Sequence, residues 1–136
     1  MRASRSISKT YEEDEMRYID RGDPAAWDKE IGDFVIGTTW RDMDLSAICP
    51  IEAANHLVHL RIFFETSAAS NHIYQVREKG NANEINTDGI SITGIYDLIR
   101  DRGVWVMLDA NRAIQYRVAG SSFTAINLSV RGWWIG

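Results

Sequence analysis

Two kinds of side chain alternate along residues 58–65, and this period of two constrains the fold more than any other feature of the chain. One set is fully apolar and consists of Val58, Leu60, Ile62 and Phe64. The interleaved set consists of His59, Arg61, Phe63 and Glu65. Because successive side chains of an extended chain point to opposite faces, the pattern predicts a β-strand with one apolar face.

The same period recurs toward the C-terminus, with short polar turns between the repeats. Alternating segments cover 104–109, 114–118 and 126–131, and the connections at 109–112 and 120–122 are rich in residues that favour tight turns. Less regular strand candidates occupy 34–36, 39–45, 71–78 and 91–99. Successive hairpins favour an antiparallel sheet, and about eight short strands without a long amphipathic helix predict an all-β fold. We therefore expect an antiparallel β-sandwich of jelly-roll type.

Residues 1–32 differ from the rest of the chain, because they carry charges of both signs and few aliphatic side chains. No helical or strand period extends over more than a few residues there. We therefore divide the chain into an extended N-terminal arm, 1–32, and a β-sandwich domain, 33–136. Charged residues of the arm are candidates for contacts that set the register between subunits, and they are Arg5, Lys9, Glu12, Glu13, Asp14 and Glu15.

The composition excludes several classes of function. A net charge of −4 argues against nucleic acid as a partner, because phosphate binding requires a basic surface. No segment approaches the roughly 20 apolar residues of a membrane span, and the N-terminus lacks the apolar stretch of a signal peptide. We expect a protein that is made in the cytoplasm and binds neither nucleic acid nor membrane.

The sequence contains no pattern typical of catalysis or of metal binding. The single Cys49 has no partner for an internal disulfide and no CxxC spacing. His56 and His59 are three residues apart, which in a strand sends them to opposite faces, and His72 stands alone. No serine lies in a G-x-S-x-G elbow. We therefore expect no enzymatic activity, no cofactor and no metal.

Two acidic groups and one tripeptide have ordinary explanations. Asp42 and Asp44 share one strand face, where solvated carboxylates need no ligand. The Asn, Glu and Asp side chains in 81–88 lack the ordered series of a calcium loop. Arg21-Gly22-Asp23 matches an integrin-binding tripeptide, but we interpret it as part of a turn.

The five tryptophans include the candidate binding residues. Consecutive strand residues point in opposite directions, so either Trp133 or Trp134 faces outward, where it forms a ligand platform, contacts a subunit or is covered by the arm. The last two alternatives are favoured, because no partner aromatic residue is obvious beside it. We select as candidates, for a subunit contact or for a ligand platform, the residues Trp133, Trp105, Trp27 and Arg131.

Several short segments along residues 18–135 carry a resemblance to a known group of proteins. They are Tyr18 to Pro24, Asp33-Phe34, Trp40 to Ser46, Ile48-Cys49-Pro50, Leu57 to Ile62, Arg77 to Asn81, Asp109 to Arg112 with Ile114-Gln115-Tyr116, and Arg131-Gly132-Trp133-Trp134. In these segments the chain resembles small β-sandwich proteins encoded among the structural genes of tailed bacteriophages and prophages. The resemblance implies a jelly-roll-like fold and a virion setting, and it supplies no catalytic residues.

Two hypotheses about function follow. The first is a virion structural protein of a tailed phage, a capsid decoration, cement or tail-associated protein. It would act through subunit contacts as a trimer or higher ring with other virion proteins. The second is a carbohydrate-binding or receptor-binding β-sandwich module that recognises a host-surface glycan. It requires an exposed Trp105 or Trp133 beside Asn, Asp or Arg.

Overall fold

The computed structural model of the chain describes residues 15–68, 70–92 and 99–136, and these ranges contain two antiparallel sheets of four strands each. The strands are β1 (Arg17–Asp20), β2 (Arg41–Asp44), β3 (Leu57–Thr66), β4 (His72–Arg77), β5 (Thr87–Ile92), β6 (Ile99–Met107), β7 (Ala113–Ala119) and β8 (Phe123–Ile135). Short 3-10 turns, η1 (Ile31–Asp33), η2 (Ile51–Ala53) and η3 (Glu84–Asn86), connect some of them. No helix in the described ranges is long and apolar enough to cross a membrane.

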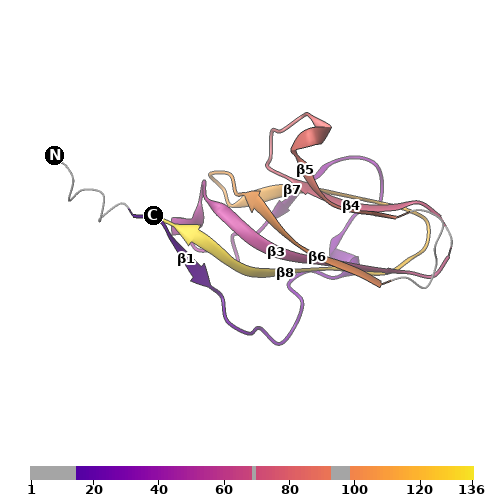
Figure 1. Cartoon of the computed structure of the whole chain (residues 1–136), viewed down its shortest axis with the longest axis horizontal. Coiled ribbons are helices and arrows are strands. Elements are labelled where there is room, and N and C mark those ends of the chain that lie inside the picture. The colour runs from indigo at the N-terminus through magenta and orange to yellow at the C-terminus, as the bar shows by residue number, and fades with distance from the viewer. Residues whose placement is uncertain (1–14, 69, 93–98) are drawn as a thin grey trace, which may run out of the picture.

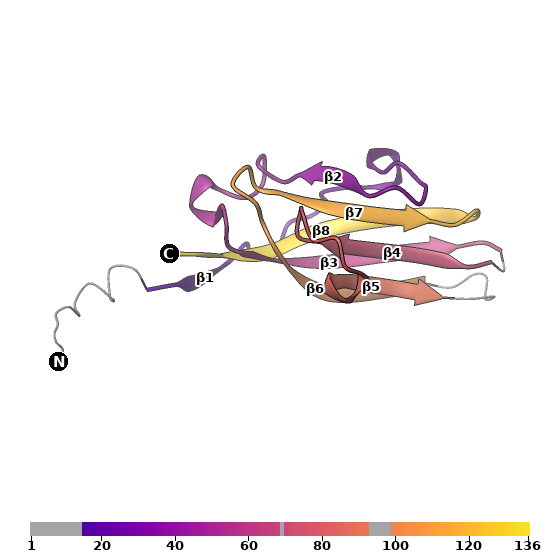
Figure 2. The same cartoon turned by 90° about the horizontal axis from the view of Figure 1, so that it is seen from above.

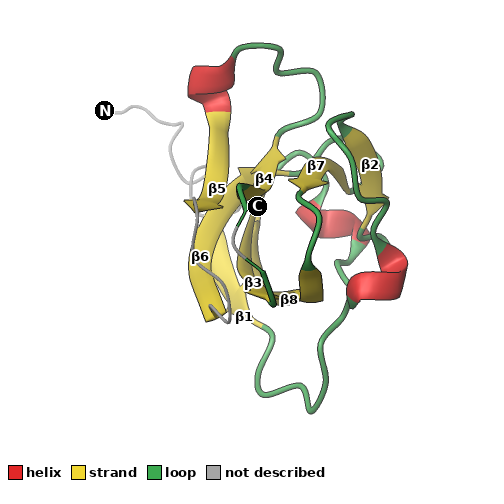
Figure 3. Ribbon diagram, turned by 90° about the vertical axis from the view of Figure 1, so that its right-hand side faces the viewer, coloured by secondary structure: helices red, strands yellow, loops and turns green. Residues whose placement is uncertain are grey.

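The strand order confirms the predicted jelly-roll sandwich. One sheet has the order β1-β8-β3-β6 and the other β2-β7-β4-β5. The first strand therefore pairs with the last, the second with the seventh, the third with the sixth and the fourth with the fifth, as in one long hairpin rolled into two layers. The layers lie one above the other in Figure 1, and Figure 2 shows the β2-β7-β4-β5 order across one of them. Figure 3 views the two facing sheets from one end.

Part of the segment expected to form an arm pairs with the sandwich. Residues 17–20 form β1, which lies antiparallel to β8, with Tyr18 opposite Trp134 and Asp20 opposite Gly132. Farther along, Lys29 bridges to Leu128 of the same strand. The chain is therefore attached to its own β8 over this stretch, and residues 1–14 lie outside the described residues.

The predicted strand at 34–36 does not form. Phe34 is instead buried between the sheets, with its ring 5.0 Å from Tyr116 and 5.5 Å from Tyr74. The Val35 N–H donates to Tyr116 Oη at 2.9 Å, and Ile36 makes only an isolated bridge. The segment crosses from one sheet to the other, from the Lys29 bridge to the Ile36 bridge, and of its apolar residues only Phe34 enters the core, whereas Val35 and Ile36 are exposed. The candidate at 91–99 divides between the end of β5 and the start of β6, and its residues 93–98 lie outside the described ranges.

β3 lies at the centre of its sheet, hydrogen-bonded to β6 on one side and to β8 on the other. Its predicted alternation is confirmed, because burial alternates along its whole length. The inward side chains are fully buried and consist of Val58, Leu60, Ile62 and Phe64. They pack with the inward side chains of β4, β6, β7 and β8 in one core. The opposite face of β3 is left half-buried on the outside of the sandwich.

We expect Leu60→Ala to lower the free energy of unfolding by about 3 kcal/mol, because the site is fully enclosed and the lost methyl groups leave a cavity. Leu57→Ala is the matched control on the same strand, since Leu57 is only half-buried on the outer face. Leu57→Ala should lower the free energy of unfolding by only about 1 kcal/mol. Urea denaturation measures both, and equal losses would contradict the assignment of the two faces.

Candidate functional site

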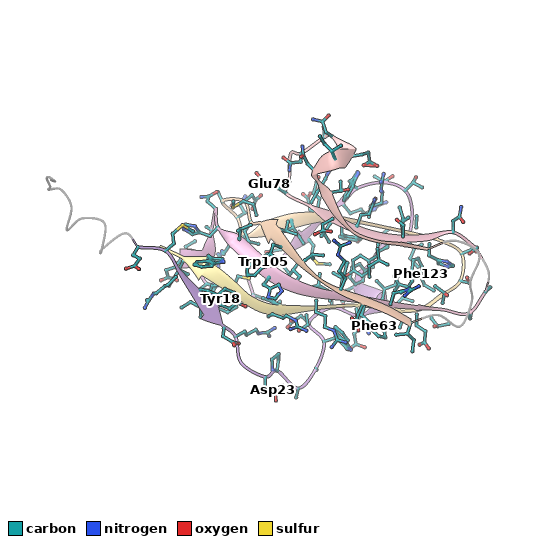
Figure 4. The ribbon with its side chains drawn as sticks, viewed as in Figure 1. Tyr18, Asp23, Phe63, Glu78, Trp105 and Phe123 are labelled. Atoms are coloured by element: carbon teal, nitrogen blue, oxygen red, sulfur yellow. The ribbon has the colours of Figure 1, made fainter. Side chains whose placement is uncertain are left out.

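Four rings from the four strands of one sheet meet on its outer face. They are Tyr18 of β1, His59 of β3, Trp105 of β6 and Trp134 of β8, and we call them the aromatic face. The Trp105 indole lies flat on the His59 imidazole, with centroids 4.2 Å apart and ring planes 7° apart. Tyr18 meets Trp105 and Trp134 edge-on, at 5.7 and 5.8 Å. Figure 4 shows Tyr18 and Trp105 close together on this sheet.

Trp105 is the exposed member of the aromatic face. The sequence left open whether both faces of its strand are covered, but the indole is 45% exposed. Its neighbours in sequence, Val104 and Val106, are buried in the core, so the alternation of β6 directs Trp105 outward. One face of the indole rests on His59 and the Tyr18 ring meets it edge-on, and 45% of the side chain stays exposed.

A β-bulge in β8 determines which of the two adjacent tryptophans joins this face. His59 pairs with Gly132 but Leu60 pairs with Val130, so Arg131 is an extra residue in the ladder. The bulge resets the alternation, and Trp133 points into the core at 9% exposed. Trp133, a candidate binding residue, therefore takes no part in the outer face, and Trp134 lines it instead.

A glycine allows Tyr18 to lie across the sheet. A Cβ atom at Gly132 would stand 2.2 Å from Tyr18 Oη and 2.4 Å from the carbonyl oxygen of Ile19. Any side chain at this position would thus collide both with the Tyr18 ring and with the backbone of β1. The glycine in the Arg131-Gly132-Trp133-Trp134 segment is required for the aromatic face to be assembled.

Opposite charges flank the rings. The Asp20 carboxylate accepts a hydrogen bond from the Gly22 N–H at 2.8 Å, and Arg131 makes no ion pair with any described residue. Burial and the nearby Asp20 charge raise the pKa of the Tyr18 phenol. Burial and the Arg131 guanidinium lower the pKa of His59. Both rings are consequently neutral at pH 7, beside one anion and one cation.

The aromatic face borders a shallow groove. One depression, of about 610 Å³, is lined by Tyr18, Asp20, Gly22, His59, Trp105, Arg131 and Trp134. A second, of about 460 Å³, is lined by residues 22–27 together with Arg61, Ser129 and Arg131. Gly22 and Arg131 line both, so the two depressions adjoin.

A second aromatic pair lies on the same face of β3. Trp27 packs against Phe63 with centroids 5.4 Å apart, and the Arg61 guanidinium lies 5.3 Å from the centroid of the Trp27 ring. Arg61 also pairs with Asp101 at 2.7 Å. Of the candidates chosen from the sequence, Trp105, Trp27 and Arg131 are thus brought to one face.

The loop that carries Trp27 is pinned to β8. Arg21 Nη1 pairs with Asp28 and also donates to the Val130 carbonyl at 3.1 Å, while Asp28 accepts from the Val130 N–H at 2.8 Å. Figure 4 shows Asp23 at the outer end of this loop. Because the Arg21 side chain is held by these contacts, the arginine of the Arg21-Gly22-Asp23 tripeptide is not free to bind a partner.

The fifth tryptophan lies on the other sheet. The Trp40 ring packs against the guanidinium groups of Arg77 and Arg117, which lie 4.1 and 4.7 Å from its centroid. Arg77 and Arg117 are in turn bound to Gln115 and Gln75. These contacts explain the position of Trp40 on the surface of that sheet without a ligand.

The remaining candidates have local partners. Asp42 binds Lys79 and Gln115, and Asp44 accepts from the Ser46 N–H. His72 is fully buried and bonds to the Ser70 carbonyl at 3.0 Å. Among the described residues, no three His, Cys, Asp or Glu side chains come together in a metal-binding group.

Cys49 and the charged arm residues complete the sequence-derived set. Burial raises the pKa of the Cys49 thiol to about 11, so it is neutral at pH 7. Glu15 is exposed. The other candidate arm contacts, Arg5, Lys9, Glu12, Glu13 and Asp14, lie outside the described residues.

Three members of the aromatic face were not selected from the sequence, and they are Tyr18, His59 and Trp134. Tyr18 lay in the segment assigned to the arm, and His59 was considered only as a metal ligand or an ordinary strand histidine. The usable signal was the outward position of His59 in the 58–65 alternation. Nothing local, however, indicates that Tyr18 and Trp134 would pair across more than a hundred residues.

We expect His59 to titrate below 6.5, its ordinary pKa, because both burial and the Arg131 charge disfavour the imidazolium. As the pH falls through 6.5, the unfolded chain takes up this proton more readily than the folded chain, so stability decreases. Arg131→Gln should raise the pKa of His59, because the guanidinium charge is removed. Two-dimensional NMR of the imidazole signals measures it, and an unchanged midpoint in the variant would contradict the placement of Arg131.

Neither a protein-family model nor any curated protein matches the chain.

Proposed function

We propose that the protein is a non-catalytic carbohydrate-binding β-sandwich, a receptor-binding type of module. The observation that carries the proposal is the Trp105 indole, which is stacked on His59 and remains 45% exposed beside a groove. The C–H face of a sugar ring packs well on such a platform, because it is apolar and flat like the indole. A contiguous group of apolar side chains with a polar rim marks an interaction site, and Trp105 belongs to such a group with Tyr18, His59 and Trp134.

The polar groups around the platform suit sugar hydroxyls. Asp20 offers carboxylate oxygens as acceptors, and Arg131 offers guanidinium N–H donors, within the same depression as Trp105. A few polar groups around an apolar floor are the usual arrangement of a small-ligand site, where they orient the ligand. The combination supports recognition of a ring that has one apolar face and a polar rim.

The aromatic residues beside Trp105 and Trp134 favour the ligand-platform hypothesis over the subunit-contact hypothesis. Without a partner aromatic residue, an outward tryptophan favours a subunit contact or a cover formed by the arm. Trp134 has Tyr18 of β1 beside it, and Trp105 has both Tyr18 and His59. An assembled group of rings favours a ligand platform over an isolated apolar contact.

A virion structural role through subunit contacts remains the second candidate. Its support is the resemblance to tailed-phage structural proteins and the position of Trp105 on β6, an edge strand of its sheet. A subunit that added a strand beside β6 would satisfy the free backbone groups of that edge and cover the indole. This candidate predicts a trimer or larger ring held together by Trp105.

We expect Trp105→Ala to weaken binding to a recognised glycan at least tenfold, since the stacking surface is lost. The free energy of unfolding should fall by no more than about 1 kcal/mol, because the indole is largely outside the core. A glycan array followed by calorimetry with wild type and variant measures the loss of affinity.

Ile99→Ala is the matched control, because Ile99 is an exposed apolar residue of the same strand, 56% exposed, and does not line the groove. It should bind as wild type does. Sedimentation of the same variants separates the two candidates. If Trp105→Ala dissociates an oligomer and wild type binds no glycan, the carbohydrate proposal is wrong and the subunit-contact candidate is supported.

A further inference from the structure

We infer that the groove binds a chain of sugar rings, a neutral oligosaccharide that runs from Trp105 to Trp27, and not a single terminal sugar. This inference rests on the proposed carbohydrate-binding function and adds the class and length of the ligand. Its basis is the continuity of the two depressions, which share Gly22 and Arg131.

Trp105 and Trp27, the two aromatic platforms of the groove, are too far apart for one sugar ring to touch both. Trp105 lies opposite His59 on β3, and Trp27 packs on Phe63 of the same strand. His59 and Phe63 are four residues apart and project from the same face. At about 3.4 Å per residue, His59 and Phe63 are about 14 Å apart along the strand, which exceeds the length of a single sugar ring.

The surface between the platforms is polar. Ser129 lies opposite Arg61 in the ladder, and both line the second depression with Arg131. Arg61 is held by its ion pair with Asp101, so the Ser129 hydroxyl and the Arg131 guanidinium are the groups that would bond to the hydroxyl groups of a bridging sugar. Arrays of this kind, aromatic at two points and polar between them, match a chain whose rings present apolar faces at intervals.

The charge of the groove favours a neutral chain. Its charged lining residues are two aspartates, Asp20 and Asp23, and two arginines, Arg61 and Arg131. Because Arg61 is already paired with Asp101, the groove has no excess of positive charge. An acidic polysaccharide would gain from the arginines and lose to the aspartates. A neutral oligosaccharide can use both kinds of group as hydrogen-bonding partners without that conflict.

Calorimetry with cello-, malto-, manno- and galacto-oligosaccharides of one to six residues tests the inference, with oligogalacturonates as the acidic comparison. For wild type we expect the affinity to rise with chain length within the series that binds. Trp27→Ala should lower the hexasaccharide affinity about tenfold and leave the disaccharide affinity unchanged. Trp40→Ala, on the opposite sheet, is the matched tryptophan control and should bind as wild type does.

A second variant covers the case in which Trp27→Ala fails to fold. Ser129→Phe places a ring on the path between the platforms without removing either one, and it should give the same selective loss for the hexasaccharide. Thermal melting verifies that each variant is folded.

The outcomes separate this inference from the function on which it rests. Affinity that does not change with length, or variants that weaken short and long saccharides equally, would overturn the chain-binding inference and leave a single-ring site. Stronger binding of oligogalacturonates would overturn the neutral ligand. If wild type bound no saccharide in any series, the proposed function would fail together with the inference.

Discussion

The period of two in β3 is the constraint on which the rest of the structure depends. Its inward residues are fully buried and hold the two sheets together, and its central position in the sheet aligns β6 and β8 on either side. The same alternation projects His59, Arg61 and Phe63 outward, in a row. Core and candidate site are therefore two faces of one strand, and a slip of one residue in its register would exchange them.

The candidate site also needs two local departures from a regular sheet. The bulge at Arg131 sends Trp133 into the core and Trp134 outward, and it gives the Arg131 side chain its place between the two depressions. Gly132 leaves room for Tyr18 to cross β8 and reach Trp105. Bulges and glycines of this kind weaken a ladder, and here both lie beneath the aromatic face, which they help to assemble.

The sequence predicted the parts of the fold that depend on local pattern. The strands around residues 58–65, 104–108, 114–118 and 126–131 were recognised from their alternation, because each has one face in the core. β1 was not recognised, since four residues are too short for a period and its partner lies at the other end of the chain. The sequence also could not predict which of Trp133 and Trp134 faces outward, because the alternation of side chains does not reveal where a β-bulge lies. Trp105, Trp27 and Arg131 were selected by residue type, and only the tertiary fold joins them to Tyr18 and His59.

The most direct test of the account is an NMR titration of the tryptophan indole N–H signals with the neutral oligosaccharide panel. The chain has five tryptophans, two of which, Trp40 and Trp133, lie away from the groove. We predict that a binding oligosaccharide shifts the signals of Trp105, Trp134 and Trp27 and leaves those of Trp40 and Trp133 in place. No shift with any saccharide, or a shift confined to Trp40, would contradict a carbohydrate site on the aromatic face.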